Sequence, residues 1–205
     1  MRRQFEEQLR DIMERLTETS ERNRDLEEVY RRLVSLRISN AHHASLELVV
    51  ANHFLSRGYR VWVEHEKDGL ILDVYSLGDR EVGVEVETAF IPPEVLDSPE
   101  DYLTARLTVK VARYGKSVQD FYIAVPSYVF PPLPAVFLKA PEERDEEELR
   151  CLFRLVRRFH NIPGLDLRSL KEGRLSGLLS VNLSSLSVSS LDVAVLSRNS
   201  EVDCP

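Results

Sequence analysis

Two glutamates in the segment GVEVETAF, residues 83–90, are the residues whose types and spacing first suggest chemistry. Because successive side chains of a strand alternate between its faces, Glu85 and Glu87 would share a face with Gly83, while valines occupy the other face. Asp73, in the preceding apolar segment GLILDVYS, would lie opposite Gly83 or Glu85 if the two segments pair as an antiparallel hairpin. Either register brings Asp73 and Glu85 within reach of one cation.

Three carboxylates on one patch repel one another, so we expect a positive group among them. At an effective dielectric constant of about 20, two like charges about 4 Å apart oppose each other by about 4 kcal/mol. An all-carboxylate site without thiolates or imidazoles suits a hard cation, so the sequence predicts an Mg²⁺ or Mn²⁺ site at Asp73, Glu85 and Glu87. Such an ion can polarise a phosphoryl oxygen and make hydroxide from bound water. Two glutamates alone, however, are typical of a solvated strand face.

Two helices would add further charged groups. Glu47 lies in the apolar segment ASLELVVANHF, four residues after His43 and therefore on the same helix face. Separately, His43 is typical of a polar helix residue near a buried edge, and Glu47 could pair with an arginine. In a later helix, Arg106, Lys110 and Arg113 form a basic stripe at spacings of four and three. The stripe could contact phosphates, although such a stripe is also typical of a salt-bridged surface.

The elements that would position these residues follow one another in a predicted core domain over residues 39–130. Ser39 or Asn40 can cap a first helix, which runs to about Arg57, and Gly58 and Gly115 end helices. The sequence predicts, in order, that helix, strands over 59–65, 70–76 and 80–90, a second helix over 98–114 and a strand over 120–130.

Segments on either side of this core are expected to be helical or flexible. Residues 1–38 predict a long helix, because mostly apolar residues recur at alternating spacings of four and three, interrupted by Thr19 and Asn23. This heptad seam favours a coiled-coil homodimer over packing on the chain's own domain. Residues 131–183 predict a C-terminal helical extension with a strand near 178–183, and residues 184–205 a flexible tail rich in Ser and Leu.

Composition restricts the class of protein. The 205 residues are 43% hydrophobic and 30% charged, which is typical of one globular domain with extensions. No apolar run reaches the roughly 18 residues that a membrane span needs, and the charged N-terminal segment does not resemble a signal peptide, so we expect a cytoplasmic protein without a membrane partner. Cys151 and Cys204 form no metal or disulfide motif. Residues 41–130 hold eight basic and fourteen acidic residues, which argues against a nonspecific nucleic-acid coat.

The order of elements and the placement of acids resemble the PD-(D/E)xK nuclease superfamily. That family has a restriction-endonuclease-like α/β core of a helix, a three-stranded meander, a helix and a strand, and the outline here is similar to archaeal Holliday-junction resolvases. By this resemblance, Glu47 corresponds to the family's helix acid, Asp73 to its strand-two acid and Glu85 to its strand-three acid. Glu87 stands where the family keeps a lysine, and Lys110 is the candidate to supply that amine from the neighbouring helix.

The resemblance implies a divalent-metal-dependent endonuclease that hydrolyses phosphodiester bonds in DNA, more so than in RNA. Asp73 and Glu85 would ligate the metal, Glu87 would ligate it or orient water, and Glu47 would support the site. The basic stripe would contact the phosphates. Because the EVE segment lacks the motif lysine, the alternative is a domain that has lost catalysis and acts as a nucleic-acid-binding or coiled-coil scaffold.

Overall fold

The protein has an α/β fold built on one mixed, open sheet of six strands. The computed structural model describes residues 2–18, 24–36 and 40–196. The helices and strands are α1 (Arg2–Glu18), α2 (Arg24–Ser35), α3 (Ala41–Leu55), β1 (Arg60–Lys67), β2 (Leu70–Leu77), β3 (Glu81–Val86), α4 (Pro99–Tyr114), β4 (Asp120–Pro126), α5 (Glu146–Phe159), α6 (Leu167–Glu172), β5 (Gly177–Asn182), β6 (Ser187–Asp192) and α7 (Val193–Leu196). Short 3₁₀ helices lie at Pro93–Val95, Ala135–Leu138 and Pro141–Glu143.

The strands lie in the sheet in the order in which they occur along the chain. β1, β2 and β3 form an antiparallel meander, β4 runs parallel to β3, β5 runs parallel to β4, and β6 closes the far side antiparallel to β5. Each parallel pair needs a connection that returns to the same end of the sheet, and α4 makes this connection between β3 and β4. In the described part of the chain, β1 and β6 are therefore the edge strands.

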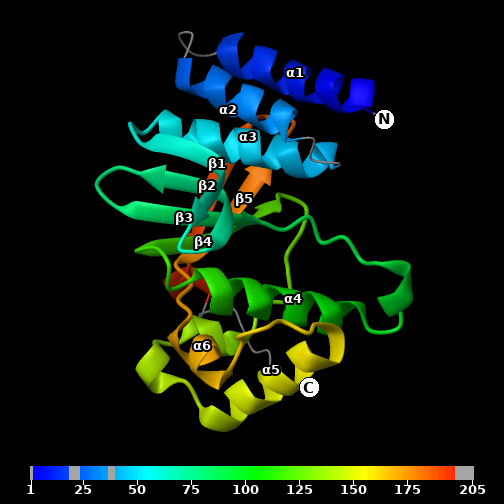
Figure 1. Cartoon of the computed structure of the whole chain (residues 1–205), viewed down its shortest axis with the longest axis vertical. Coiled ribbons are helices and arrows are strands. Elements are labelled where there is room, and N and C mark those ends of the chain that lie inside the picture. The colour runs from blue at the N-terminus through cyan, green and yellow to red at the C-terminus, as the bar shows by residue number, and fades with distance from the viewer. Residues whose placement is uncertain (1, 19–23, 37–39, 197–205) are drawn as a thin grey trace.

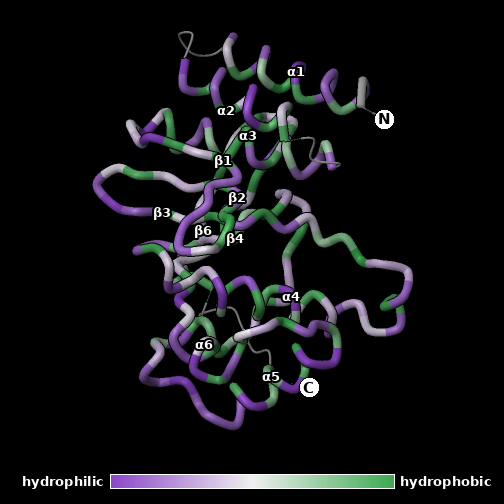
Figure 2. The backbone as a smooth tube through the Cα atoms, viewed as in Figure 1, coloured by the Kyte–Doolittle hydropathy of each residue, from purple (hydrophilic) through white to green (hydrophobic). Residues whose placement is uncertain are grey.

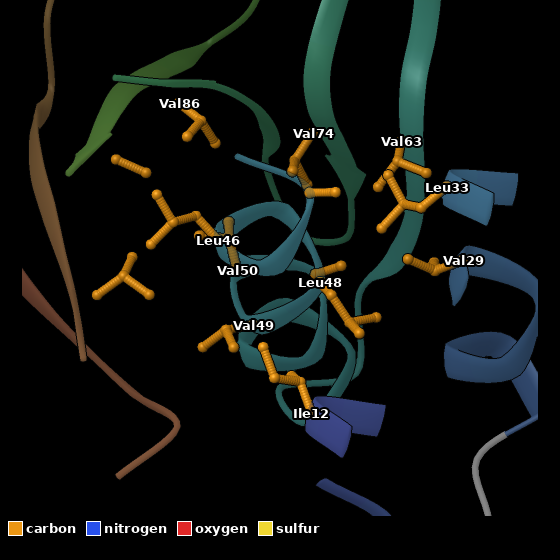
Figure 3. Packing of buried hydrophobic residues seen from close by; sticks show 14 of the residues in the cluster. Ile12, Val29, Leu33, Leu46, Leu48, Val49, Val50, Val63, Val74 and Val86 are labelled. Carbon is orange, nitrogen blue, oxygen red and sulfur yellow. The ribbon is translucent and has the colours of Figure 1, made fainter. Parts of the chain in front are cut away.

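Helices cover both faces of the sheet and form two core layers (Figure 1). α1, α2 and α3 lie over one face, and the buried residues labelled in Figure 3 come from these helices and from the strands beneath them. α4, α5 and α6 lie over the opposite face, where they pack with Phe121, Ile123 and Leu178. Strand alternation explains the division, because neighbouring strand residues such as Leu178 and Leu179 belong to different layers.

The two faces of β3 are both covered by helices. Val82, Val84 and Val86 pack in the α3 layer. Gly83 faces the α4 layer, where a Cβ atom would meet the two methyl carbons of Val118 at 3.0 Å and 3.2 Å. Glu85 shares that face and is only 4% exposed. The glutamate face of β3 is therefore covered by α4 rather than by solvent.

The sequence-based prediction of the middle of the chain is confirmed in its order of elements. α3 begins after Asn40, whose Oδ1 accepts hydrogen bonds from the backbone N–H groups of His42 and His43; the alternative cap, Ser39, lies outside the described residues. β1 and β2 meet at a tight turn in which Asp68 and Gly69 have φ of +52° and +76°. Positive φ at both central residues is the requirement of a two-residue hairpin turn.

The prediction of one long helix over residues 1–38 is wrong. The chain forms α1 and α2, which lie side by side and both pack against α3 (Figure 1). Hydrophobic and hydrophilic residues alternate along both helices (Figure 2), and the apolar residues of the predicted seam are buried in the α3 layer of the chain's own core. The described seam residues Phe5, Leu9, Ile12, Leu16, Leu26 and Leu33 belong to that layer, and Tyr30 is partly buried against it. Thr19 and Asn23 lie outside the described residues. A dimer through this seam is therefore not needed to bury these residues.

The C-terminal part of the chain is more ordered than expected. The predicted strand near 178–183 is β5, but β5 pairs with β4 and thus joins the core sheet. Residues 187–192, predicted to lie in a flexible tail, form β6. The turn before β6 is closed by Asn182, whose Oδ1 accepts hydrogen bonds from the N–H groups of Ser184 and Ser185. Residues 197–205 of the predicted tail lie outside the described residues. None of the described helices is both long and apolar enough to cross a membrane.

A candidate site of carboxylates and cations between α3 and α4

Asp73 and Glu85 meet where β2 and β3 stop pairing through their backbones. The register places Tyr75 opposite Gly83 and Val74 opposite Val84, so Asp73 lies beside Glu85. Oε1 of Glu85 accepts a hydrogen bond from the N–H of Asp73 at 3.3 Å, and Oδ2 of Asp73 accepts one from the N–H of Val86 at 2.6 Å. The carboxylates thus replace the next backbone hydrogen bonds of the ladder, which holds both side chains at this end of the hairpin.

Lys110 reaches this pair from α4. Its Nζ lies 2.9 Å from Oε2 of Glu85 and 3.9 Å from Oδ2 of Asp73, and it donates a hydrogen bond to the carbonyl oxygen of Val86 at 3.1 Å. Burial alone would lower the pKa of Lys110, but the neighbouring carboxylates, Glu85 foremost, raise it above the ordinary lysine value. Lys110 therefore stays positive and neutralises part of the carboxylate charge.

Glu87 is held by a different cation. It forms an ion pair with Arg106 of α4, and its Oε1 accepts a hydrogen bond from the N–H of Ala89 at 2.6 Å. Arg106 also donates to the carbonyl oxygen of Phe90 at 2.9 Å, and its guanidinium lies 5.2 Å from the ring centroid of Tyr102. Glu87 thus belongs to a buried ion pair beside the Asp73 and Glu85 pair.

His43 and Glu47 approach Asp73 from α3, on the other side of the sheet. Nε2 of His43 lies 3.1 Å from Oε1 of Glu47 and 3.6 Å from Oδ2 of Asp73. Glu47 has no exposed surface, and within the described part of the chain its Oε2 has no hydrogen-bond partner. A buried carboxyl group without a full set of partners is costly, so Glu47 lowers the stability of the fold at this position.

Glu64 of β1 completes the group through an unusual backbone conformation. Val63 pairs with Val74 and His65 with Leu72, which puts Glu64 across from Asp73. Glu64 has φ of +47°, in the left-handed region. This conformation shifts the alternation of β1, because Trp62 and His65, three residues apart, both lie against the ring of Tyr75. A left-handed glutamate in a strand is strained, and such strain is common at functional sites.

The electrostatics of the group are dominated by burial and by these mutual contacts. Burial would lower the pKa of His43, but the carboxylates of Asp73 and Glu47 raise it to about 10. Burial raises the pKa of Glu47 to about 8 and that of Glu85 to about 7, against the opposing effect of a nearby cation in each case. Burial would likewise raise the pKa of Asp73, but His43 and Lys110 hold it below its ordinary value.

Acidic and cationic side chains are both numerous in the site. The carboxylates of Glu47, Glu64, Asp73, Glu85 and Glu87 face the cationic groups His43, Arg106 and Lys110. Arg32 also acts on Glu64, so five acidic side chains face four cationic ones within the described residues. The raised pKa values of Glu47 and Glu85 reduce the negative charge that these two carry at neutral pH. The set of oxygen donors with one imidazole is chemically suited to a divalent metal ion, whose binding would displace the protons held by His43 and Glu47.

The structure brings together most of the residues that the sequence singled out. Asp73, Glu85, Glu87, Glu47 and Lys110 lie in one connected group of contacts. The third residue of the basic stripe, Arg113, lies apart from these contacts, with its guanidinium 5.2 Å from the ring centroid of Tyr114. The two other members of the stripe point into the site, so their charge is used for carboxylates within the chain.

Sequence reasoning undervalued His43 and missed Glu64. The signal for His43 was its spacing of four from Glu47, which the helix converts into a contact. The signal for Glu64 was its place opposite Asp73 once β1 and β2 are paired as a hairpin. Comparisons of the chain with protein-family models, with curated proteins and with solved structures gave no match. Function is therefore inferred from the chemistry of the site.

Proposed function

We propose that the protein is a divalent-metal-dependent endonuclease that hydrolyses phosphodiester bonds in DNA. The observation that supports this most is the position of Lys110, which brings an amine from α4 to within 2.9 Å of Glu85 and 3.9 Å of Asp73. An amine beside two strand acids is the arrangement that the resemblance to restriction-endonuclease-like nucleases requires. The meander followed by α4 and β4 supplies the matching order of elements.

The residues present fit a metal ion. The site has an excess of carboxylates, and a carboxylate oxygen of Glu47 is buried without a hydrogen-bond partner among the described residues. Asp73, at the centre of the contacts, would be a ligand in every arrangement of the ion, and Glu85 and Glu87 are the further candidates from the strand motif. Such an ion, Mg²⁺ or Mn²⁺, supplies Lewis-acid polarisation of the phosphate and a more acidic water.

The chain's own residues would prepare the substrate and the water. Lys110 keeps its proton at neutral pH, so its Nζ donates to an oxygen of the attacking water or of the phosphate, and Glu85 holds Nζ in that position. Arg106 is held by Glu87 and by the carbonyl oxygen of Phe90, which keeps a second positive charge beside the site. α4 is therefore the helix that would face the phosphodiester backbone.

A second function is favoured by one observation. Glu85 and Glu87 are each already paired with a cation of α4, as in a domain whose carboxylates have a structural role. Such a domain would bind nucleic acid or a protein partner without cutting. The coiled-coil form of this scaffold is less supported, because α1 and α2 bury their apolar residues against α3.

Cutting assays separate the two functions. Purified protein is incubated with linear duplex, branched and single-stranded DNA, and with RNA, in Mg²⁺ or in Mn²⁺. We expect cleavage of at least one DNA substrate, its loss in Asp73→Asn, and its retention in the control Asp97→Asn, which changes an exposed aspartate outside the site. Absence of cleavage on every substrate, or cleavage that survives Asp73→Asn, would overturn the enzymatic function.

A further inference from the structure

Three half-buried residues from three elements converge on the α3 side of Asp73. His43 comes from α3, Glu64 from β1 and Asp73 from β2, and each offers a ligand atom that lies within 4.8 Å of the other two. This is the spacing of donors that share one metal ion. The group overlaps the site of the proposed function only at Asp73, because the other two residues lie away from Glu85 and Glu87.

Glu47 provides an independent indication that a cation belongs here. Its side chain has no exposed surface, Oε1 lies 3.1 Å from Nε2 of His43, and Oε2 is without a hydrogen-bond partner in the described residues. Asp73 and Glu64 are close enough to disfavour its charge. Glu47 therefore has one oxygen beside an imidazole and a second buried oxygen that is free to accept a further donor or cation.

The conformation of Glu64 indicates that its side chain is needed at this place. Glycine would adopt φ of +47° without cost, but the chain keeps a glutamate there, in the middle of an edge strand. The left-handed turn shifts the alternation of β1, and the carboxylate comes to lie near His43 and Asp73. Strain of this kind persists only where the surrounding structure fixes the backbone, and it is common at binding sites.

An ion can reach the group from solvent. A groove of about 660 Å³ runs along the edge of β1 beneath α2, and Glu64 is among its lining residues. The other acids of the groove are Asp25, Glu28 and Glu66, set against Arg32 and Arg60. The excess of acids favours the entry of a cation over that of an anion.

The acids on the α4 side are less available. Glu85 is paired with Lys110 and Glu87 with Arg106, so a metal ion there would compete with a fixed cation for each carboxylate. On the α3 side, the only cationic partner of Asp73 and Glu47 among the described ion pairs is His43, and an imidazole can itself become a ligand.

We propose that His43, Glu64 and Asp73 ligate a divalent first-row transition-metal ion, with Glu47 as a fourth donor. The ion lies on the α3 side of Asp73 rather than between Glu85 and Glu87. An imidazole nitrogen among carboxylate oxygens favours Mn²⁺, Co²⁺ or Zn²⁺ over Mg²⁺, which prefers oxygen ligands alone. The inference names the ligands of the ion that the proposed function uses, but it concerns binding, which is measured without substrate and without cutting.

Mn²⁺ binding to the full chain provides the test. Electron paramagnetic resonance of free Mn²⁺ follows its uptake by the protein at neutral pH, and a large excess of Mg²⁺ is then added. We expect one Mn²⁺ per chain that Mg²⁺ does not displace. His43→Gln and Glu64→Gln should each weaken Mn²⁺ binding by more than about tenfold. Substitution of a residue that only hydrogen-bonds to a metal ligand already weakens binding by about this factor.

Two matched variants serve as controls. His53→Gln changes another histidine of α3, which contacts Arg57, and Glu94→Gln changes an exposed glutamate that does not line the groove. Both should bind Mn²⁺ as the original chain does. Urea unfolding of each variant confirms that it is folded, and Glu64, at a sheet edge and half-exposed, tolerates an isosteric change better than a core residue.

Three results would overturn the inference. The first is no Mn²⁺ uptake, which would leave protonated His43 as the cation of Asp73 and Glu47. The others are displacement of bound Mn²⁺ by Mg²⁺, and Mn²⁺ binding that is lost in Glu85→Gln but kept in Glu64→Gln. The proposed function fails separately. If the chain binds Mn²⁺ as described but cuts no nucleic acid, the metal site stands and the proposed nuclease activity is refuted. If the chain cuts DNA with Mg²⁺ and His43→Gln leaves the cutting unchanged, the nuclease activity stands and the metal site at His43 is refuted.

Discussion

Replacing Lys110 by methionine tests the ion pair on which the α4 side of the site depends. Methionine keeps most of the aliphatic volume of lysine and removes the charge, so Glu85 and Asp73 lose the amine at 2.9 Å and 3.9 Å. Glu85 is 4% exposed, and breaking a buried pair on one side costs about 3 to 5 kcal/mol of unfolding free energy because the remaining charge is uncompensated. We expect a loss of this size for Lys110→Met in urea unfolding at about pH 9.

The loss should depend on pH in a defined direction. Burial raises the pKa of Glu85 to about 7 even beside Lys110, and loss of the amine raises it further. Below about pH 7, folded Glu85 is protonated in both proteins, so they differ least. Above about pH 7, Glu85 is still protonated in the folded variant but not in the folded original protein or in either unfolded state. The difference in unfolding free energy between the two proteins therefore grows by about 1.4 kcal/mol for each pH unit, until the pH reaches the pKa of Glu85 in the variant.

A second substitution and a surface control make the measurement decisive. Lys110→Met combined with Glu85→Gln removes both charges and should recover most of the stability at about pH 9. Lys116→Met, at a half-exposed pair with Glu172, should cost less than about 1 kcal/mol at every pH. An equal loss for Lys110→Met at about pH 6 and pH 9, or no recovery in the double variant, would refute the buried pair.

Three further predictions concern the stability of the metal-free chain. Burial holds the pKa of Glu47 at about 8, so the unfolded state loses its proton first and stability falls as pH rises from about 4.5 to about 8; Glu47→Gln should flatten that slope in urea unfolding, and an unchanged slope would contradict the burial described. Glu64→Gly should raise the free energy of unfolding by up to about 1 kcal/mol through relief of the left-handed φ, whereas Glu66→Gly, in ordinary strand conformation, should lower it. Arg144→Met should cost about 2 to 4 kcal/mol, because the buried guanidinium donates through Nη1 to three carbonyl oxygens at the C-terminal end of α6; a midpoint of thermal unfolding within a degree of the original would contradict this role.

Local signals were sufficient to predict the hairpins and the two central helices. The cap at Asn40, the Asp68 and Gly69 turn and the start of α4 at Pro99 are set by residues within a few positions of one another. The alternation of β3 also follows from local geometry, which is why Glu85 could be assigned to one face before the partner of that face was known. Features of this kind can be predicted from sequence because they depend on the backbone conformation of a few neighbouring residues.

The partners of the carboxylates could not be predicted in the same way. The stripe of Arg106 and Lys110 is identical in sequence whether it faces solvent or the sheet, and only the packing of α4 on β3 decides that it pairs with Glu85 and Glu87. The N-terminal seam failed for the same reason, since an apolar stripe is satisfied equally by a second chain or by α3. The sequence pattern identifies which residues share a face of a helix or strand, but only the tertiary contacts show which element covers that face.

Asp73 is the residue that connects the α3 side of the site with the α4 side. Leu72 packs in the α4 layer and Val74 in the α3 layer, although strict alternation would put them on the same face. The break in alternation at Asp73 lies opposite the left-handed Glu64, so both strands are irregular at the same level. That shared irregularity lets a single carboxylate contact His43 from one helix and Lys110 from the other. Charge bound on the α3 side must therefore change the electrostatics on the α4 side. A metal ion at His43 and Glu64 would weaken the attraction between Asp73 and Lys110, while Glu85 and the carbonyl oxygen of Val86 would continue to hold the amine.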